Sequence, residues 1–201
     1  LGIMVIKPHL AAGIALLALL GGRWTAMAVA AVIVVGALGL STLVFGTGIW
    51  PAFFQGIGEA SGFLAKRMYP LFRMSSVYAC VSSLGGSPVF AMTVHGVVAA
   101  GGIAALLYAW RNGYDPRRLA AIACVTSLLV SPYNYDYDLT ILGLAIAFVL
   151  KDIIALSRTY EMLVLCGLSW FVTGYGLGAH TARNEGVALS ELATVSGRSF
   201  I

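Results

Sequence analysis

Two uninterrupted apolar runs place the strongest limit on what this chain can fold into. Each run, Trp24–Phe45 and Val89–Trp110, has 22 residues, and neither contains an acidic or basic residue other than His95. As helices they extend about 33 Å, enough for a bilayer core of about 30 Å. The chain is 60% hydrophobic and only 10% charged, whereas soluble domains carry about 25% charged residues. The sequence therefore predicts an all-α fold, a polytopic bundle of transmembrane helices.

Shorter apolar segments complete the expected organisation. Residues 1–20 are apolar except at Lys7-Pro8-His9, where the proline fits a helix start or a kink. Residues 162–177 form a short final span, so we expect a transmembrane helical domain over 1–177 and a polar, poorly ordered tail over 178–201. Because the chain begins with Leu1 inside an apolar run, without a signal-peptide pattern, we expect it to be the carboxy-terminal portion of a longer protein.

A polar stretch, residues 131–138 (SPYNYDYD), lies between two apolar runs of 12 residues each. A helix of 12 residues is only about 18 Å long, so the stretch is expected near a membrane surface. Asp115-Pro116 is a helix-start signal for the first run, and Ser131-Pro132 ends it. The second run extends through Lys151 to Leu156. Carboxylates at a membrane boundary are costly unless they are partnered, which favours a functional site.

Two questions about this stretch stay open at the level of sequence. The simpler interpretation is a hydrated hairpin between two helices, although such a turn has no need of paired acids between aromatic residues. In an extended loop Asp136 and Asp138 share a side, whereas in a helix they diverge by about 200° and only one faces the site. Lys7 has a similar alternative, since it either meets a ligand or extends to a lipid phosphate.

Residues 46–88 form the longest region with interspersed polar residues. Its first part, residues 49–74, mixes aromatic residues with Lys66, Arg67 and Arg73, a pattern typical of a segment lying in the membrane interface. This segment is either an amphipathic connector or a platform for a lipid substrate. Residues 75–87 are rich in small side chains and predict a short or re-entrant helix that ends at Gly85-Gly86.

Positive charge orients the helices in the membrane. Three short connectors fall on one side and carry six basic residues: Arg23, Arg111, Arg117, Arg118, Lys151 and Arg158. The stretch 131–138 falls on the other side and has none. That side also holds Lys66, Arg67 and Arg73, but they lie in a long loop, where the positive-inside rule counts for less. Because Lys and Arg collect in cytoplasmic loops, the acidic aromatic loop is expected outside the cytoplasm.

Several other kinds of site are not indicated. Cys80, Cys124 and Cys166 lie in apolar surroundings without metal-ligand spacing, and the three histidines form no zinc-like cluster. We therefore expect no metal and no cofactor. The net charge of +4 is modest and suits a membrane protein without a nucleic-acid partner. No glycine-rich nucleotide loop is present either.

The residue types in the polar stretch suit carbohydrate chemistry. Tyrosine rings cover the apolar face of a sugar, while Asp and Asn bond its hydroxyls. A carboxylate can also remove a hydroxyl proton as a general base. The candidate substrate-binding residues are those of the stretch and of the early basic turn: Lys7, His9, Tyr133, Tyr135, Asp136, Tyr137 and Asp138.

A family resemblance rests on the order of several short motifs. They are residues 7–10 (KPHL), Arg23-Trp24 before a long helix, Phe45-Gly46 with Trp50, and residues 131–139 (SPYNYDYDL). Over residues 5–150 the chain resembles the family 87 glycosyltransferases, membrane mannosyltransferases of the GT-C superfamily. Where some members have two histidines after the aspartate, this chain has Tyr137 and Asp138.

The resemblance implies transfer of a hexose, expected to be mannose, from a polyprenyl-phosphate donor. The acceptor would be a glycolipid or glycan outside the cytoplasm, and the protein a multi-pass component of a cell membrane such as a bacterial inner membrane. The catalytic base of such enzymes lies in an early loop, which is expected upstream of Leu1. Lys7 and His9 would then meet the donor phosphate, while Asp136 and Asp138 bind substrate or support the site.

Two other functions compete with the enzyme. Discontinuous helices with acidic residues at the break also build ion-coupled transporters, although the sequence has no internal repeat and its break lies near a surface. A non-catalytic membrane scaffold is the third possibility. Loss of sugar transfer on neutralising one aspartate would favour the enzyme, and loss of ion-coupled uptake would favour the transporter.

Overall fold

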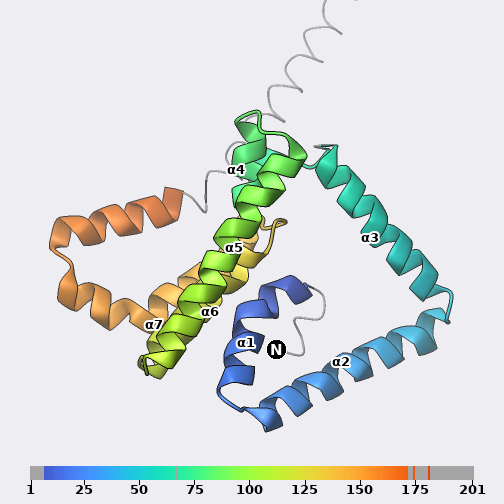
Figure 1. Ribbon diagram of the computed structural model, residues 1–201, viewed down its shortest axis with the longest axis horizontal. Coiled ribbons are helices and arrows are strands. Elements are labelled where there is room, and N and C mark those ends of the chain that lie inside the picture. Colours follow the sequence, from blue (N-terminus) through green and yellow to red (C-terminus); the bar gives the residue numbers. More distant parts are fainter. Residues whose placement is uncertain (1–6, 67, 172–173, 175–180, 182–201) are drawn as a thin grey trace, which may run out of the picture.

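The computed structural model describes residues 7–66, 68–171, 174 and 181 (Figure 1). Over this part of the chain the structure is helical and contains no strand, as the apolar runs predicted. The expected tail, apart from residue 181, and the end of the expected final span lie outside the described residues. Residues 159–171, which include the described start of that span, are helical.

The elements in chain order are η2 Pro8–Ala11, α1 Ala12–Leu20, α2 Trp24–Phe45, α3 Ile49–Ala65, η3 Leu71–Arg73, α4 Val77–Ser83, α5 Pro88–Arg111, α6 Pro116–Val130, η4 Asp136–Leu139 and α7 Thr140–Leu156.

The helix boundaries follow from short-range chemistry in the sequence. Pro116 is the first residue of α6, and the Asp115 carboxylate before it accepts a hydrogen bond from the Arg117 amide at 2.8 Å. The Ser87 hydroxyl caps α5 in the same way at 3.2 Å from the Phe90 amide. Gly22 has a φ of 59° in the turn that joins α1 to α2, a conformation that favours glycine. Helix caps and glycine turns therefore determine where each helix begins and ends, which the apolar runs alone do not specify.

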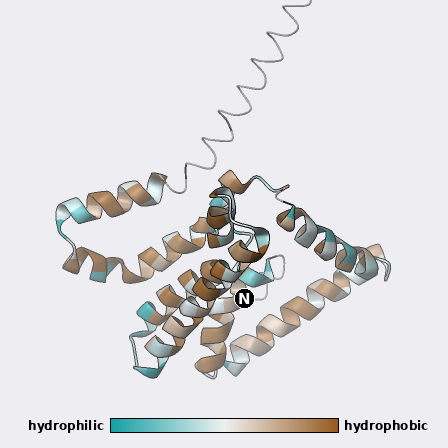
Figure 2. Ribbon diagram, turned by 45° about the horizontal axis from the view of Figure 1, so that its top comes forward, coloured by the Kyte–Doolittle hydropathy of each residue, from teal (hydrophilic) through white to brown (hydrophobic). Residues whose placement is uncertain are grey.

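Within the described residues, three helices are long and apolar enough to cross a membrane: α2, α5 and the segment Asp136–Leu156, which consists of η4 and α7. Figure 2 shows hydrophobic residues along the whole length of α2. No residue of α2 is buried inside the protein, and Leu43 is 85% exposed. An apolar helix with so much exposed surface suits a lipid environment and not water.

The central bundle is organised around α6, which packs against α1, α5 and α7. Its contact with α1 is close enough for a hydrogen bond between the two helices: the Gly13 amide donates to the Ser127 hydroxyl at 3.0 Å. Ala123 and Ser127 are fully buried there. By contrast, α2 and α3 leave the bundle and return to it at η3 and α4 (Figure 1). The α1–α6 contact thus holds the start of the described chain against the helix that precedes the polar stretch.

Adding a methyl group at Gly13 is expected to destabilise the bundle. A Cβ at this position would clash with the backbone carbonyl oxygen of Ala123 and lie 2.9 Å from the Ser127 amide nitrogen. We expect Gly13→Ala to lower the free energy of unfolding by about 2 kcal/mol, because overpacking a rigid contact typically costs 1–3 kcal/mol. Gly36→Ala on α2 is the matched control, since its Cβ meets nothing within 4 Å. Thermal unfolding in detergent measures both, and equal effects would contradict the close contact.

The bundle has two distinct ends. At one end, Arg118 near the start of α6 bonds Asp152 near the end of α7, with Nε and Oδ2 2.9 Å apart. The chain from α6 to α7 passes through residues 131–138 at the opposite end, where η2 also begins. The polar stretch and Lys7 therefore meet at the end away from Arg118.

Candidate functional site

The polar stretch forms a compact loop whose backbone is held by buried side chains. A proline at position 132 has no N–H, so the Leu128 carbonyl loses its regular helical partner. The side-chain amide of Asn134, which is 2% exposed, donates a hydrogen bond to that carbonyl. His95 of α5 lies 3.3 Å from the Val130 carbonyl through Nε2. Because a carbonyl only accepts, Nε2 carries the hydrogen. The lone histidine on α5 is thus a structural partner of the helix end.

A second chain segment lies along this loop. The Ser75 amide donates to the Asn134 carbonyl at 2.8 Å, and Met74 and Tyr135 form an isolated antiparallel bridge. Tyr69 packs edge-on against Tyr133, with ring centroids 6.0 Å apart. These contacts bring η3, which carries Arg73, next to η4, which carries the two aspartates. Residues from the long loop therefore belong to the site.

Asp138 is paired with Lys7 from the beginning of the described chain. The Lys7 ammonium lies 2.7 Å from Oδ1 and 2.9 Å from Oδ2, although 131 positions separate the two residues. The Asp138 side chain is 5% exposed and that of Lys7 33%. Burial, the largest single effect, lowers the pKa of Lys7, but the hydrogen bonds and charges of Asp138 and Tyr137 together raise it above its usual value. Lys7 is therefore a cation at neutral pH.

Asp136 is paired with Arg73 in a two-point contact. Arg73 donates from Nε to Oδ2 at 3.1 Å and from Nη2 to Oδ1 at 3.0 Å. The Asp136 side chain is 8% exposed and that of Arg73 25%. The hydrogen bonds that Arg73 donates to Asp136 raise the pKa of Arg73, against a smaller opposing effect of burial. Such fork-to-fork pairing fixes orientation as well as charge.

The two carboxylates point in different directions, which resolves the alternative left open by the sequence. Asp136 and Asp138 lie two residues apart in the 3-10 helix η4, so their side chains diverge by about 120°. One faces Arg73 and the other Lys7. Each therefore has its own cation, and the loop has two chemically different faces.

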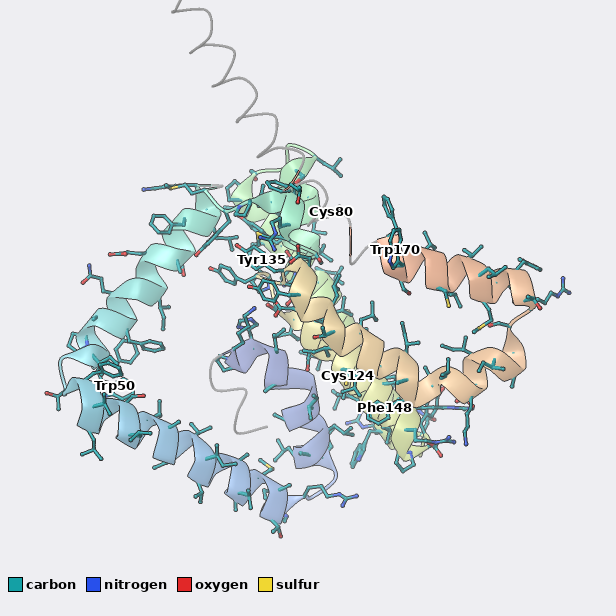
Figure 3. All side chains as sticks on the ribbon, turned by 180° about the vertical axis from the view of Figure 1, so that it is seen from behind. Trp50, Cys80, Cys124, Tyr135, Phe148 and Trp170 are labelled. Carbon is teal, nitrogen blue, oxygen red and sulfur yellow. The ribbon has the colours of Figure 1, made fainter. Side chains whose placement is uncertain are left out.

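The tyrosines of the loop differ in exposure, since Tyr135 is partly buried and Tyr137 is exposed. Tyr135 and Tyr137 stack with centroids 5.5 Å apart and planes at 3°. The Lys7 ammonium lies 4.1 Å from the Tyr137 ring centroid, a cation–π contact. Tyr137 is 54% exposed, whereas burial raises the pKa of the partly buried Tyr135. Figure 3 shows Tyr135 at this end of the bundle, so an aromatic surface lies between the two ion pairs.

His9 lies two residues beyond Lys7, and its imidazole interacts electrostatically with both members of the same ion pair. Its Nε2 atom is buried without a hydrogen-bond partner among the described residues. Burial lowers the pKa of His9, the Lys7 charge lowers it further, and Asp138 partly offsets both. The imidazole is therefore neutral at pH 7 and adds no positive charge to the site.

The lowered pKa predicts how His9 affects stability. Below about pH 6.5, the usual histidine pKa, the unfolded chain binds a proton at His9 that the folded protein accepts only at lower pH. The free energy of unfolding therefore falls as the pH drops from about 6.5. We expect wild type to lose more thermal stability between pH 7.5 and 5.5 than His9→Gln. Identical losses would contradict this role of His9.

Arg73 and Asn134 are the site residues that sequence reasoning missed. In the sequence Arg73 is one of several basic residues in a segment typical of the membrane interface, and Asn134 is not among the candidate substrate-binding residues. One signal was available for Arg73, because a carboxylate at a membrane boundary needs a cation and the long loop falls on the same side as residues 131–138. For Asn134, the missing N–H of Pro132 implied that another donor must reach the Leu128 carbonyl.

Comparison with known families identifies the group to which the chain belongs. The model of glycosyltransferase family 87 matches residues 1–132, about two thirds of the sequence. The chain belongs to glycosyltransferase family 87. Membership together with the apolar helices indicates a membrane glycosyltransferase, as the order of the motifs predicted. No curated protein and no solved structure matches the chain significantly.

The family 87 match covers only part of the site. Lys7, His9 and Arg73 lie within it, whereas Tyr133 and the residues that follow lie beyond its end at residue 132. The expected resemblance extended to residue 150, so the acidic part of the loop has no support from the family model. Its inclusion in the site rests on the geometry, because Asp136 and Asp138 bond cations from the matched region. In the part of the chain that the structure describes, no three His, Cys, Asp or Glu residues gather as metal ligands do.

Proposed function

We propose that the protein transfers a hexose, mannose in the first instance, from a polyprenyl-phosphate donor to a glycan or glycolipid. One observation carries the proposal beyond family membership: two buried carboxylates, each paired with a cation, flank stacked tyrosines at one end of an apolar bundle. This arrangement offers charge for a phosphate and aromatic surface for a sugar beside a lipid-soluble helix bundle.

The proposed step is a substitution at the anomeric carbon of the donor sugar. An acceptor hydroxyl oxygen forms a bond to that carbon while the carbon–oxygen bond to phosphate breaks. The bonding electrons leave with the polyprenyl phosphate, and a general base takes the hydroxyl proton. Lys7 stabilises the charge that develops on the departing phosphate. An ammonium has three N–H donors and Lys7 is one-third exposed, so a phosphate can bind it beside Asp138.

The hydrogen bonds of the two aspartates favour a positioning role over that of the base. Asp138 Oδ2 accepts from the Tyr135 amide at 3.0 Å in addition to Lys7, and Asp136 Oδ1 accepts from the Tyr137 amide at 2.9 Å in addition to Arg73. All four carboxylate oxygens thus already accept at least one hydrogen bond. We assign Asp138 to holding Lys7 and Asp136 to holding Arg73, while the exposed ring of Tyr137 covers the sugar.

The distribution of positive charge supports a site on the extracytoplasmic side of the membrane. The six basic residues named above lie in the connectors after α1, α5 and α7 or in the helix ends beside them, whereas residues 131–138 carry none. With the basic connectors in the cytoplasm, Lys7 and the two aspartates lie at the extracytoplasmic surface. A polyprenyl-phosphate donor is suited to that location, because its lipid tail keeps it in the membrane and no soluble nucleotide is needed.

The test is sugar transfer by the protein reconstituted in lipid. Radiolabelled polyprenyl-phosphate mannose and a membrane glycolipid extract are supplied, with matched vesicles lacking protein as the control. Label in the glycolipid fraction is the expected result. Absence of transfer from mannosyl and other hexosyl donors would overturn the proposal. Proton- or sodium-coupled sugar uptake under the same conditions would overturn it in favour of a transporter.

A further inference from the structure

A cavity lies on the Arg73 side of the site. Its volume is about 520 Å³, within the range of about 300–1,000 Å³ usual for small-molecule sites. Its walls come from η3, the following loop, α4, η4 and Phe171 of the helical segment 159–171, and they include Phe72, Arg73, Ser75, Cys80, Ser83 and Asp136. Lys7 and Tyr137 are not among the lining residues, so the cavity is separate from the face where the donor phosphate is proposed to bind.

The charge balance of this cavity favours a neutral ligand. Arg73 and Asp136 are the charged residues of its lining and have opposite signs, so the lining carries no net charge. The polar groups nevertheless remain able to bond a ligand. Arg73 Nη1 makes no hydrogen bond to any described residue, and the exposed Ser75 and Ser83 contribute hydroxyls. Donors and acceptors of this kind, beside an aromatic ring, match the hydroxyls and the apolar face of a sugar.

The geometry of η4 places this cavity next to the reacting groups. Asp136 lines the cavity, and Asp138, two residues further along the same short helix, holds Lys7. A ligand in the cavity and a phosphate at Lys7 would therefore approach the loop from its two different faces. A transferase needs this arrangement, because the acceptor hydroxyl must reach the sugar from the side opposite or adjacent to the leaving phosphate.

We propose that the cavity bounded by Arg73, Asp136, Ser75 and Ser83 is the acceptor subsite, which binds an uncharged sugar residue of the glycan or glycolipid. The assignment rests on the proposed transferase function. The two ion pairs then have different roles: Lys7–Asp138 faces the donor, and Arg73–Asp136 orients the acceptor sugar.

Cys80 offers a direct measurement of occupancy that does not depend on catalysis. Its side chain is exposed and lines the cavity, and Figure 3 shows it on α4 at the end of the bundle that carries Tyr135. Cys124 is buried, so replacing Cys166 with serine leaves Cys80 as the accessible thiol among the described residues. The rate at which a maleimide modifies Cys80 then reports whether the cavity is filled.

Methyl α-mannoside is the probe. At five times its dissociation constant, mass action leaves about one cavity in six free, so modification is expected to slow about sixfold. Ser83→Phe, which fills the cavity, should remove the response to mannoside. Leu84→Phe is the matched control, because it adds the same ring at the neighbouring position, which does not line the cavity. Cys166 in a Cys80→Ser background controls for general effects of the sugar and should be modified at an unchanged rate.

The outcomes separate the subsite from the enzyme. Mannoside protection without any sugar transfer would support the subsite while the proposed function fails. Transfer without protection at any mannoside concentration would overturn the subsite while the function stands. Protection of Cys80 by polyprenyl phosphate or by inorganic phosphate, but not by mannoside, would overturn the assignment to an uncharged sugar.

Discussion

Replacing Arg73 with methionine is expected to lower the free energy of unfolding by about 3 kcal/mol, the low end of the range for breaking a buried ion pair. The physical reason is the partner left behind. Asp136 is 8% exposed on its side chain, and without the guanidinium its carboxylate stays buried with only the Tyr137 amide to bond it. Arg73 is itself one-quarter exposed, which keeps the effect at the lower end. Chemical denaturation of the detergent-solubilised protein measures the change.

A double-mutant cycle, which adds Asp136→Asn and the double variant to Arg73→Met, distinguishes pairing from simple packing. In the double variant Arg73→Met/Asp136→Asn, no charge is left unpaired, so we expect much of the lost stability to return. If the two single changes add in the double variant, the pair is not coupled and this account is wrong. Arg117→Met is the matched control. Arg117 and Asp115 form an ion pair that is 54% and 43% exposed, and such surface pairs contribute about 0–1 kcal/mol.

The parts of the fold that sequence predicted are those set by local chemistry. The apolar run Trp24–Phe45 has the same bounds as α2. The apolar run Val89–Trp110 is one residue shorter than α5 at each end. Asp115-Pro116 and Ser131-Pro132 correctly predicted the beginning and the end of α6. In each case a cap, a proline or the length of an apolar run sufficed, because these signals act within a few residues.

The site could be predicted only in part, because its decisive contacts join distant segments. Sequence reasoning found Asp136 and Asp138 through their unusual position and Lys7 through its apolar surroundings. It had no means of pairing them, since Lys7 and Asp138 lie 131 residues apart and Arg73 and Asp136 lie 63 apart. Those pairs depend on α1 packing against α6 and on η3 lying beside the loop. The direction in which each aspartate points likewise follows from η4, a single turn whose helical form the alternating tyrosines did not reveal.

Removing the Lys7 ammonium is the change with the largest expected effect on catalysis. We expect Lys7→Met to lower the rate of sugar transfer about 100-fold at saturating donor, because one preorganised charge at a developing anion typically contributes that much. Lys7→Arg keeps the charge and should retain a larger part of the rate, although a guanidinium differs in shape from an ammonium. Single-turnover transfer from labelled donor measures the chemical step apart from product release.

The Asp138 variants show whether this lysine and aspartate act as one unit. Asp138→Asn keeps the shape of the side chain but loses the charge that holds Lys7 above the Tyr137 ring, so transfer should also slow. If Asp138 acts only through Lys7, then Lys7→Met/Asp138→Asn should be no slower than Lys7→Met alone, since effects of residues that act together are not additive. Losses that multiply would instead give Asp138 a direct role toward substrate. Arg117→Met, at the opposite end of the bundle, should transfer sugar at the wild-type rate, which ties any loss to the Lys7 end and not to the removal of a positive charge in general.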